Sequence, residues 1–311
     1  MGDDFGHIPV MLDEVLEVFA PIDTGVVVDA TVGGGGHARA ILDAHDRVHL
    51  IGFDRDPAAL VAAEARLAPH SDRVGLYHAT FEDFGRRLDE LGITDISGVL
   101  FDLGVSSHQL DQSTRGFSFR SEGPLDMRMD PQSPRSAAEL VNDSDEATLA
   151  SVLKDFGDER HARRIARAIV AARPLETTTE LATVIADAMP AASRRSPGHP
   201  ARRSFQALRI AVNAELEMVE RGIDQAVDRL GPGGRGAVLS YHSGEDRIVK
   251  RRLRAAAGLD SVGARGLPPP EPPSIRLLRR GGRTASEAEV EANPRASAAR
   301  LRSFERLGPP A

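Results

Sequence analysis

The sequence predicts an α/β protein: a parallel β-sheet flanked by helices, with an inserted all-helical domain. Over the first third of the chain, apolar runs of strand length alternate with helical patterns, which is typical of parallel strands joined by right-handed crossovers. The first of these runs leads directly into a glycine-rich turn. A helix-only stretch follows further along, and a strand-like run then returns at 236–241. The helical stretch therefore interrupts the sheet domain.

Four apolar runs are expected to form neighbouring strands, at 26–30, 48–53, 74–79 and 98–102. Helices such as 57–67, which has a proline in its first turn, lie between them. Ligands of parallel sheets bind beyond the carboxyl ends of the strands. The polar and aromatic residues at these expected ends are Asp29, Asp54, Phe81 and Asp102.

The turn after the first expected strand has the sequence Val32-Gly33-Gly34-Gly35-Gly36-His37. Glycine permits the tight backbone path of such a turn and places no Cβ between the backbone and a ligand. The helix expected from about Ala38 offers unpaired N–H groups at its start. We therefore expect a cradle for a cofactor that contains adenosine.

Asp54 extends this turn into a dinucleotide-type pattern. Gly33, Gly35 and Ala38 have the spacing G-x-G-x-x-A, and Asp54 lies nineteen positions after Gly35. An acid there accepts hydrogen bonds from ribose hydroxyls. The alternative interpretation is a strand-end or helix-cap acid before Pro57. NAD and S-adenosylmethionine both contain such a ribose, so the pattern leaves the choice between them open.

The middle of the chain is expected to be a loop followed by helices. Residues 111–135 are polar and rich in glycine and proline, and a loop of that length is usually functional or disordered. Helical patterns fill 136–189, a long helix is expected over 202–230, and the glycine-rich stretch 231–234 is expected as a turn into the fifth strand. The predicted domains are the first part of the sheet domain at 1–110, the helical substrate-recognition insert at 111–212 and the second part of the sheet domain at 213–311.

Charge is distributed unevenly along the chain, whose net charge is −7. Residues 151–212 contain eleven Lys and Arg against six Asp and Glu, and residues 245–306 contain fourteen against eight. Arginine supplies nearly all of these cations and suits contacts with phosphates and bases. A preference for arginine codons and solvated helix faces is the alternative explanation. The last part is expected to hold a loop at 262–273, a strand at 274–278 and a basic helical segment at 293–306.

Composition excludes several kinds of site. The chain has 311 residues and no cysteine, which excludes disulfides, thiolate metal sites and a cysteine nucleophile. The sequence has no secretory signal, no apolar run long enough to span a bilayer and no pattern of metal ligands. We therefore expect a cytoplasmic protein with no metal and no membrane partner. The oligomeric state stays open, a homodimer included.

Long motifs along most of the chain resemble those of one family. They are Asp29 to His37, Gly52-Phe53-Asp54-Arg55-Asp56, Phe101-Asp102-Leu103-Gly104-Val105-Ser106-Ser107-His108-Gln109-Leu110-Asp111, Arg115-Gly116-Phe117-Ser118-Phe119, Pro124-Leu125-Asp126-Met127-Arg128-Met129-Asp130, Phe205 to Asn213, and Ser240-Tyr241-His242-Ser243-Gly244-Glu245-Asp246-Arg247. The chain is thereby similar to the RsmH (MraW) family of bacterial 16S ribosomal RNA cytosine-N4 methyltransferases. It departs from the family at Tyr241, where phenylalanine is usual.

The resemblance implies a class I methyltransferase fold (a Rossmann-like sheet) with an inserted helical domain, and S-adenosyl-L-methionine as the cofactor. It also implies the substrate, a cytidine near the P site of the decoding region of 16S rRNA in the 30S subunit. The cofactor contacts that it implies are Gly33, Gly34, Gly35, Gly36, His37, Asp54, Phe81, Asp102 and Gln109.

The expected reaction needs a residue that orients the poorly nucleophilic N4 amine or takes its proton. Asp102 is our candidate, because it ends the fourth expected strand; the alternative is that it only contacts the amino group of the cofactor. A target base must also leave its stack and be held by aromatic or polar side chains. The candidates for that role are Phe117, Phe119, Arg128, Tyr241 and His242.

Three other functions remain to be compared with this one. An NAD-dependent oxidoreductase would share the glycine turn and Asp54. A non-catalytic RNA-binding or ribosome-assembly factor would not need an intact Gly33–Gly36 turn, Asp54 and Asp102 together. A methyltransferase acting on DNA or protein is disfavoured by the family resemblance alone.

Overall fold

The computed structural model describes residues 9–191, 199–260 and 272–308. The chain divides into two compact units. Unit 1 comprises Met1–Gly104 and Leu216–Ala311, and unit 2 comprises Val105–Glu215. Each unit has its own hydrophobic core, so each is described by itself.

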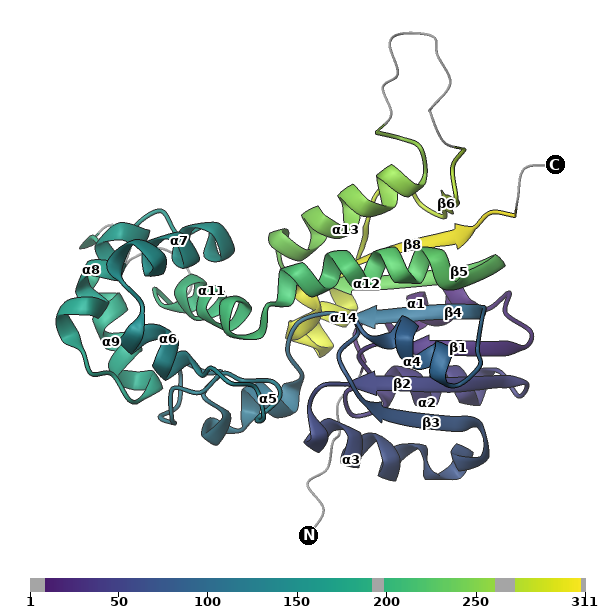
Figure 1. Cartoon of the computed structure of the whole chain (residues 1–311), viewed down its shortest axis with the longest axis horizontal. Helices are drawn as coiled ribbons and strands as arrows, with labels where there is room; N and C mark the ends of the chain where they lie inside the picture. Colours follow the sequence, from purple (N-terminus) through teal and green to yellow (C-terminus); the bar gives the residue numbers. More distant parts are fainter. Residues whose placement is uncertain (1–8, 192–198, 261–271, 309–311) are drawn as a thin grey trace, which may run out of the picture. The chain divides into compact units, whose positions relative to one another are not determined.

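Unit 1 contains an eight-stranded sheet with the order β3-β2-β1-β4-β5-β8-β6, and β7 also pairs with β8 (Figure 1). The pairs from β3 to β5 are parallel, whereas β8 is antiparallel to β5, β6 and β7. This mixed sheet confirms the expected α/β class. The strands are β1 Gly25–Asp29, β2 Val48–Asp54, β3 Val74–His78, β4 Ile96–Asp102, β5 Leu230–Ser240, β6 Ile275–Leu277, β7 Arg283–Thr284 and β8 Arg300–Arg306.

Helices cover both faces of this sheet because successive strand residues point to opposite sides. Val28 and Phe101 belong to a core cluster with residues of α4, α12 and α13, whereas their neighbours Val27 and Leu100 pack with residues of α1 and α2. No helix in the described part of the chain is long and apolar enough to cross a membrane. The helices are α1 Leu12–Phe19, α2 Gly36–Ala44, α3 Pro57–Leu67, α4 Phe84–Glu90, α12 Glu215–Arg229, α13 Ser243–Ala256 and α14 Glu287–Ala292, with 3₁₀ turns at Ala68–Arg73 and Pro294–Ala298.

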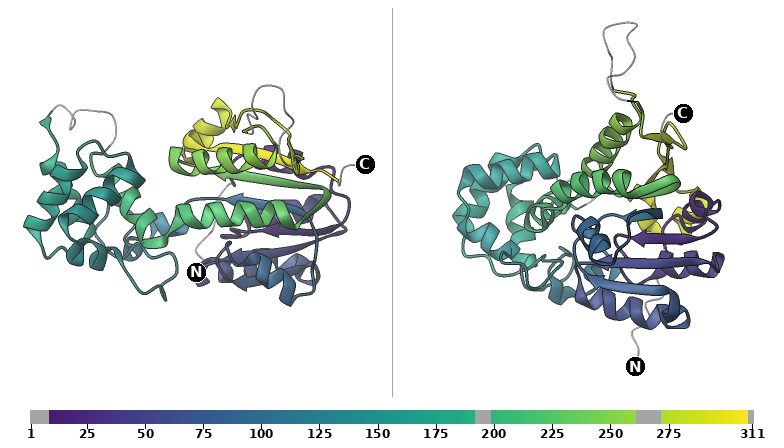
Figure 2. Two further views of the ribbon diagram at one scale, coloured as in Figure 1. Left: turned by 45° about the horizontal axis from the view of Figure 1, so that its top comes forward. Right: turned by 45° about the vertical axis from the view of Figure 1, so that its right-hand side comes forward.

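Unit 2 consists of helices joined by loops (Figure 2). Local sequence sets where two of them begin, since Ser136 with Glu139 and Thr177 with Glu180 form capping boxes at α6 and α9. Buried aliphatic residues of α7, α8, α9 and α11 make one core. The helices are α5 Ser107–Asp111, α6 Ala137–Asp143, α7 Glu146–Gly157, α8 Ala162–Ala172, α9 Thr178–Ala188 and α11 Arg202–Asn213, with a 3₁₀ turn at Ser113–Arg115.

The structure corrects the predicted helix over 202–230. It is two helices, α11 and α12, because Ala214 between them has the left-handed φ of 49° and ends α11 with an N–H bond to the Ile210 carbonyl. Alanine rarely adopts this conformation, so its local propensity gave no sign of the break.

The predicted helical segment at 293–306 is also wrong, because its second half is strand β8. Leu301 and Phe304 lie three residues apart, a spacing typical of a helix face. In the strand they point to opposite faces, where each is buried in a different core cluster. Pairing with β5, β6 and β7 decides the conformation.

One smaller difference concerns the start of β5. The stretch 231–234 is an irregular part of β5, between the pairs Ile96–Leu230 and Gly98–Arg235, and not a turn before the strand. The expected strand at 274–278 is confirmed as β6. The proline-rich loop expected at 262–273 lies, except for its last two residues, outside the described residues.

Candidate functional site

Three carboxylates lie at the carboxyl ends of adjacent parallel strands in unit 1. Asp29 ends β1, Asp54 ends β2 and Asp102 ends β4. The glycine-rich turn between β1 and α2 lies at the same edge of the sheet. This edge is where open parallel sheets bind their ligands.

Asp54 is tied to the glycine-rich turn by its carboxylate. Its Oδ2 accepts the Gly33 N–H at 2.9 Å, and its Oδ1 accepts the Asp56 N–H at 2.8 Å. Burial raises the pKa of Asp54 to about 6, against the lowering effect of these two bonds. Each carboxylate oxygen can accept a second hydrogen bond, so Asp54 can still receive ribose hydroxyls.

The glycines of this turn are needed for different reasons. Gly33 has φ +50°, and a Cβ built there would meet only the Thr31 carbonyl, at 3.8 Å, so the space beside it is open. Gly35 has φ +77° and lies against α3, where a Cβ would come within 3.3 Å of the Ala63 Cα. A Cβ on Gly36 would lie 2.7 Å from Pro9. Of these three glycines, Gly33 is the one with open space beside its Cα.

Asp29 is 1% exposed and differs electrostatically from its neighbours. Burial raises its pKa to about 8, and the charges of Asp102 and Asp54 add to the effect. The Thr31 N–H, which donates to Asp29 Oδ1 at 3.2 Å, lowers the pKa only in part. Asp29 is therefore mostly protonated at neutral pH.

Asp102 is held by groups from three other elements. Its N–H donates to Thr31 Oγ1 at 2.6 Å, which joins the end of β4 to the glycine-rich turn. Its Oδ1 accepts the Tyr241 hydroxyl at 2.6 Å, and its Oδ2 lies 3.6 Å from His37 Nδ1. The Asp102 side chain is 28% exposed, so it can also meet a ligand.

His37, in the first turn of α2, is buried and faces inward. Its Nε2 lies 3.0 Å from the Val10 carbonyl, which can only accept, so Nε2 carries a proton. Its Nδ1 is the atom that faces Asp102. The ring thus links the segment before α1 to the candidate site.

Phe81 packs as a half-buried core residue just after β3. Its ring meets Phe101 edge-on, with centroids 5.8 Å apart. A Cβ on Gly222 of α12 would come within 2.9 Å of the Phe81 ring, so the helix passes close beside it. Phe81 as a whole is half-buried, and its expected contact with the adenine stays a prediction.

His242 is the N-cap residue of α13. Its Nδ1 accepts the N–H groups of Gly244 at 3.2 Å and Glu245 at 3.4 Å. Its Nε2 therefore carries the proton and lies 3.1 Å from Glu245 Oε1. Nδ1 of His242 thus serves the helix cap, and contact of the ring with the target base stays a prediction.

Unit 2 contains the other predicted site residues, and two of them are core aromatics. Phe117 is 6% exposed, so in this conformation it packs in the core and does not present a stacking surface. Phe119 is stacked on His199, with centroids 4.5 Å apart, and meets Phe205 edge-on. Gln109 is buried in α5, where its Oε1 accepts the Ser106 N–H at 3.1 Å.

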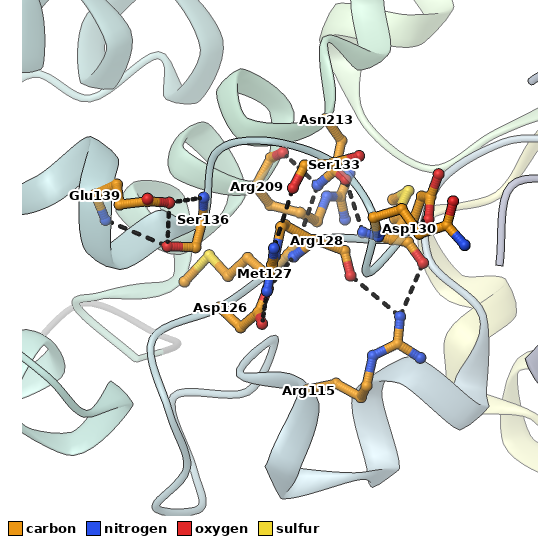
Figure 3. Close-up of polar contacts among 12 residues, drawn as sticks. Arg115, Asp126, Met127, Arg128, Asp130, Ser133, Ser136, Glu139, Arg209 and Asn213 are labelled. Carbon is orange, nitrogen blue, oxygen red and sulfur yellow. Dashed lines mark hydrogen bonds and ion pairs between the residues drawn. The ribbon is translucent and has the colours of Figure 1, made fainter.

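Arg128 is engaged within its own loop, and its expected contact with substrate stays a prediction. Its guanidinium donates to both oxygens of Asp126, at 2.7 and 2.8 Å, and to the Ser133 carbonyl at 3.0 Å (Figure 3). The Asp126 partner raises the pKa of Arg128. Arg115 donates to the carbonyls of Arg128 and Met129, so two arginines fix this loop.

Sequence reasoning missed three residues whose side chains bind the backbone beside predicted site residues. Glu245, 1% exposed, accepts the Tyr241 N–H at 2.7 Å. Thr31 binds the Asp102 backbone, and Asn213 binds the 127–129 backbone. All three lie inside motifs quoted above, but a motif does not show which member is structural.

Known proteins and one family model match nearly the whole chain. The family model of the MraW methylase family matches residues 4–307. A protein of Thermobifida fusca named Ribosomal RNA small subunit methyltransferase H is 51% identical, over 98% of this chain and 94% of its own length. Proteins with the same name from Saccharopolyspora erythraea and Heliobacterium modesticaldum are 50% and 48% identical, over 97% of this chain and 93% and 99% of theirs. The chain therefore belongs to the MraW methylase family.

Proposed function

We propose that this protein is an S-adenosyl-L-methionine-dependent methyltransferase that modifies the N4 amine of one cytidine in 16S rRNA. The relatives are named as methyltransferases of small-subunit ribosomal RNA, and they align over almost their full length. The observation that carries the proposal is the position of Asp102, which ends β4 and is bonded through Thr31 to the glycine-rich turn. A carboxylate there can meet an amine beside a cofactor held by that turn.

The chain's own residues fit the cofactor. Open space beside Gly33 gives room for the cofactor, and Asp54 has carboxylate oxygens for its ribose. The half-exposed Phe81 offers a ring edge for the adenine. We propose these contacts together with the turn residues Gly34, Gly35, Gly36 and His37, and with Asp102 and Gln109 at the methionine end. S-adenosylmethionine supplies an electrophilic methyl group on sulfur.

Asp102 then acts on the nucleophile. The lone pair of the cytosine amine is delocalised into the ring, so the amine must be oriented and must lose a proton. Asp102 can accept a hydrogen bond from the amine, which orients it, and can take the proton that it loses. Protonated Asp29, beside it, adds no further negative charge to the site at neutral pH.

Unit 2 is proposed to hold the RNA. Arg163 and Arg164 on α8 are exposed, and within residues 9–191, 199–260 and 272–308 neither forms an ion pair with a carboxylate. Arginines of this kind bind phosphates of the RNA backbone. We place the target cytidine near the P site of the decoding region, in the 30S subunit and hence in the cytoplasm.

The test is methyl transfer from labelled S-adenosylmethionine to 30S subunits from a strain that lacks this gene. The product nucleoside is identified by mass spectrometry. N4-methylcytidine at one decoding-region position is the expected result. Binding of cofactor and subunits without any transfer would instead indicate an assembly factor, and methylation at another atom would overturn the proposed acceptor.

A further inference from the structure

The register of the sheet brings Asp102 and Tyr241 together. Asp102 pairs with Leu239 across β4 and β5, and the next residue, Leu103, donates its N–H to the Leu239 carbonyl at 3.1 Å. Tyr241 follows two residues after Leu239. Because the pairing continues past Asp102, the backbone fixes the separation between the Cα atoms of Asp102 and Tyr241.

The Tyr241 hydroxyl donates a hydrogen bond to Asp102. The distance to Oδ1, 2.6 Å, is in the range of hydrogen bonds to charged oxygens. Burial raises the pKa of Tyr241 well above its ordinary value, and the charge of Asp102 adds to this. The phenol therefore keeps its proton at neutral pH, and the carboxylate oxygen is the acceptor.

Tyr241 is itself held in place from two sides. Its N–H donates to Oε2 of the buried Glu245 at 2.7 Å. Its ring lies beside Gly104, where a Cβ would come within 3.5 Å of the ring, and Gly104 has a φ of +94°. Both the backbone and the ring of Tyr241 are thus fixed before any ligand binds.

The two oxygens of Asp102 have different surroundings. Oδ1 accepts the Tyr241 hydroxyl, whereas Oδ2 faces His37 Nδ1 at 3.6 Å. The His37 ring is anchored through Nε2 at the Val10 carbonyl. Rotation of the carboxylate would therefore break the bond to Tyr241.

We propose that Tyr241 is a positioning residue for methyl transfer: its hydroxyl holds Oδ1 of Asp102 so that Oδ2 meets the substrate amine. This rests on the proposed function. As the bond between N4 and the methyl carbon forms, the bond from that carbon to sulfur breaks and sulfur keeps the electron pair. N4 then gives one proton to Oδ2, and Tyr241 transfers none. Tyr241 is thereby assigned to Asp102 and not to stacking on the base.

The first experiment compares kcat and KM of Tyr241→Phe with those of the wild type. Phenylalanine is usual at this position in the family, so the reaction does not require the hydroxyl. Loss of its hydrogen bond to Asp102 is therefore expected to lower kcat of this protein about three- to tenfold. The KM values for S-adenosylmethionine and for 30S subunits should stay within about threefold. Tyr77→Phe is the matched control, because Tyr77 is the only other tyrosine and packs on Phe53 in unit 1, and it should keep the wild-type kcat.

A double variant separates positioning from a general structural role. In an Asp102→Asn background, Tyr241→Phe should cause no further loss of kcat, because the two residues act as one unit. A merely structural tyrosine would lower kcat by the same factor in both backgrounds, and that result would overturn the proposal.

A third measurement needs no activity. With the ζ carbon of tyrosine labelled with ¹³C, the protein without cofactor gives two phenol signals, and Tyr77→Phe identifies that of Tyr241. Asp102→Asn should move the Tyr241 signal, and an unmoved signal would overturn the contact. If the wild type transfers no methyl group, the proposed function fails; if it transfers and Tyr241→Phe keeps kcat, only the positioning role fails.

Discussion

The side-chain amide of Asn213 bonds the backbone on both sides of Arg128 (Figure 3). Its Oδ1 accepts the Met129 N–H at 2.8 Å, and its Nδ2 donates to the Met127 carbonyl at 2.7 Å. Asn213 is 2% exposed, and Met127 has the left-handed φ of 59°. One amide at the end of α11 therefore holds an unusual loop conformation.

Asn213→Ala should destabilise unit 2 by about 2–4 kcal/mol, because it leaves buried backbone groups without their partner. Urea unfolding followed by circular dichroism measures the change. Gln132→Ala, at an exposed position of the same loop, should stay within about 0.5 kcal/mol. Equal stability of the two variants would show that the Asn213 bonds contribute little.

Asp29→Asn should make folding less sensitive to pH. The folded pKa of about 8 exceeds the ordinary value of 3.8, so the folded protein binds the extra proton between these values. Wild-type stability therefore falls as pH rises from about 4 to about 8, by up to about 1.4 kcal/mol per pH unit from this group. Asparagine removes that loss while its oxygen can still accept the Thr31 N–H.

The measurement is the difference in unfolding free energy between Asp29→Asn and wild type across this pH range. It should grow with pH and level off above about 8. The exposed Asp46→Asn is the control and should give a flat difference. A flat difference for Asp29→Asn as well would mean that Asp29 is ionised in the folded protein.

Asp54→Asn should weaken S-adenosylmethionine binding by about tenfold at pH 8, because a charged acceptor is lost. Since the pKa of Asp54 is about 6, wild-type affinity should fall as pH drops through 6, where the carboxylate becomes protonated. The affinity of the variant should not share this pH dependence. Calorimetric titration between pH 5 and pH 8 tests both points, and wild-type affinity in the variant would remove Asp54 from the site.

Arg163→Gln combined with Arg164→Gln should weaken binding to 30S subunits. The slope of log affinity against log salt is negative, and each lost phosphate contact makes it less steep by roughly one. Filter binding at several salt concentrations measures that slope. Arg86→Gln is the control, because Arg86 is exposed in unit 1 and paired with Glu90. An unchanged slope in the double variant would exclude this face of α8 from RNA contact.

Much of the fold follows from local pattern. The runs predicted at 26–30, 48–53, 74–79 and 98–102 are strands, because continuous apolar sequence suits a sheet buried on both faces. Where the pattern was ambiguous, pairing with neighbouring strands determined the secondary structure. The apolar spacing of 300–306 fits a helix, but the segment pairs with β5 and β6 as a strand.

The strand–turn–helix at Gly33 to His37, the acids at the strand ends and the family could all be predicted before folding is considered, because they depend on residue types at fixed local spacing. The contacts of each side chain are known from the folded structure alone. That structure turned Phe117 into the core of unit 2, paired Arg128 with Asp126, and brought Tyr241 to Asp102 across 139 positions of the chain. Such contacts depend on strand register and packing, which spacing along the sequence does not encode.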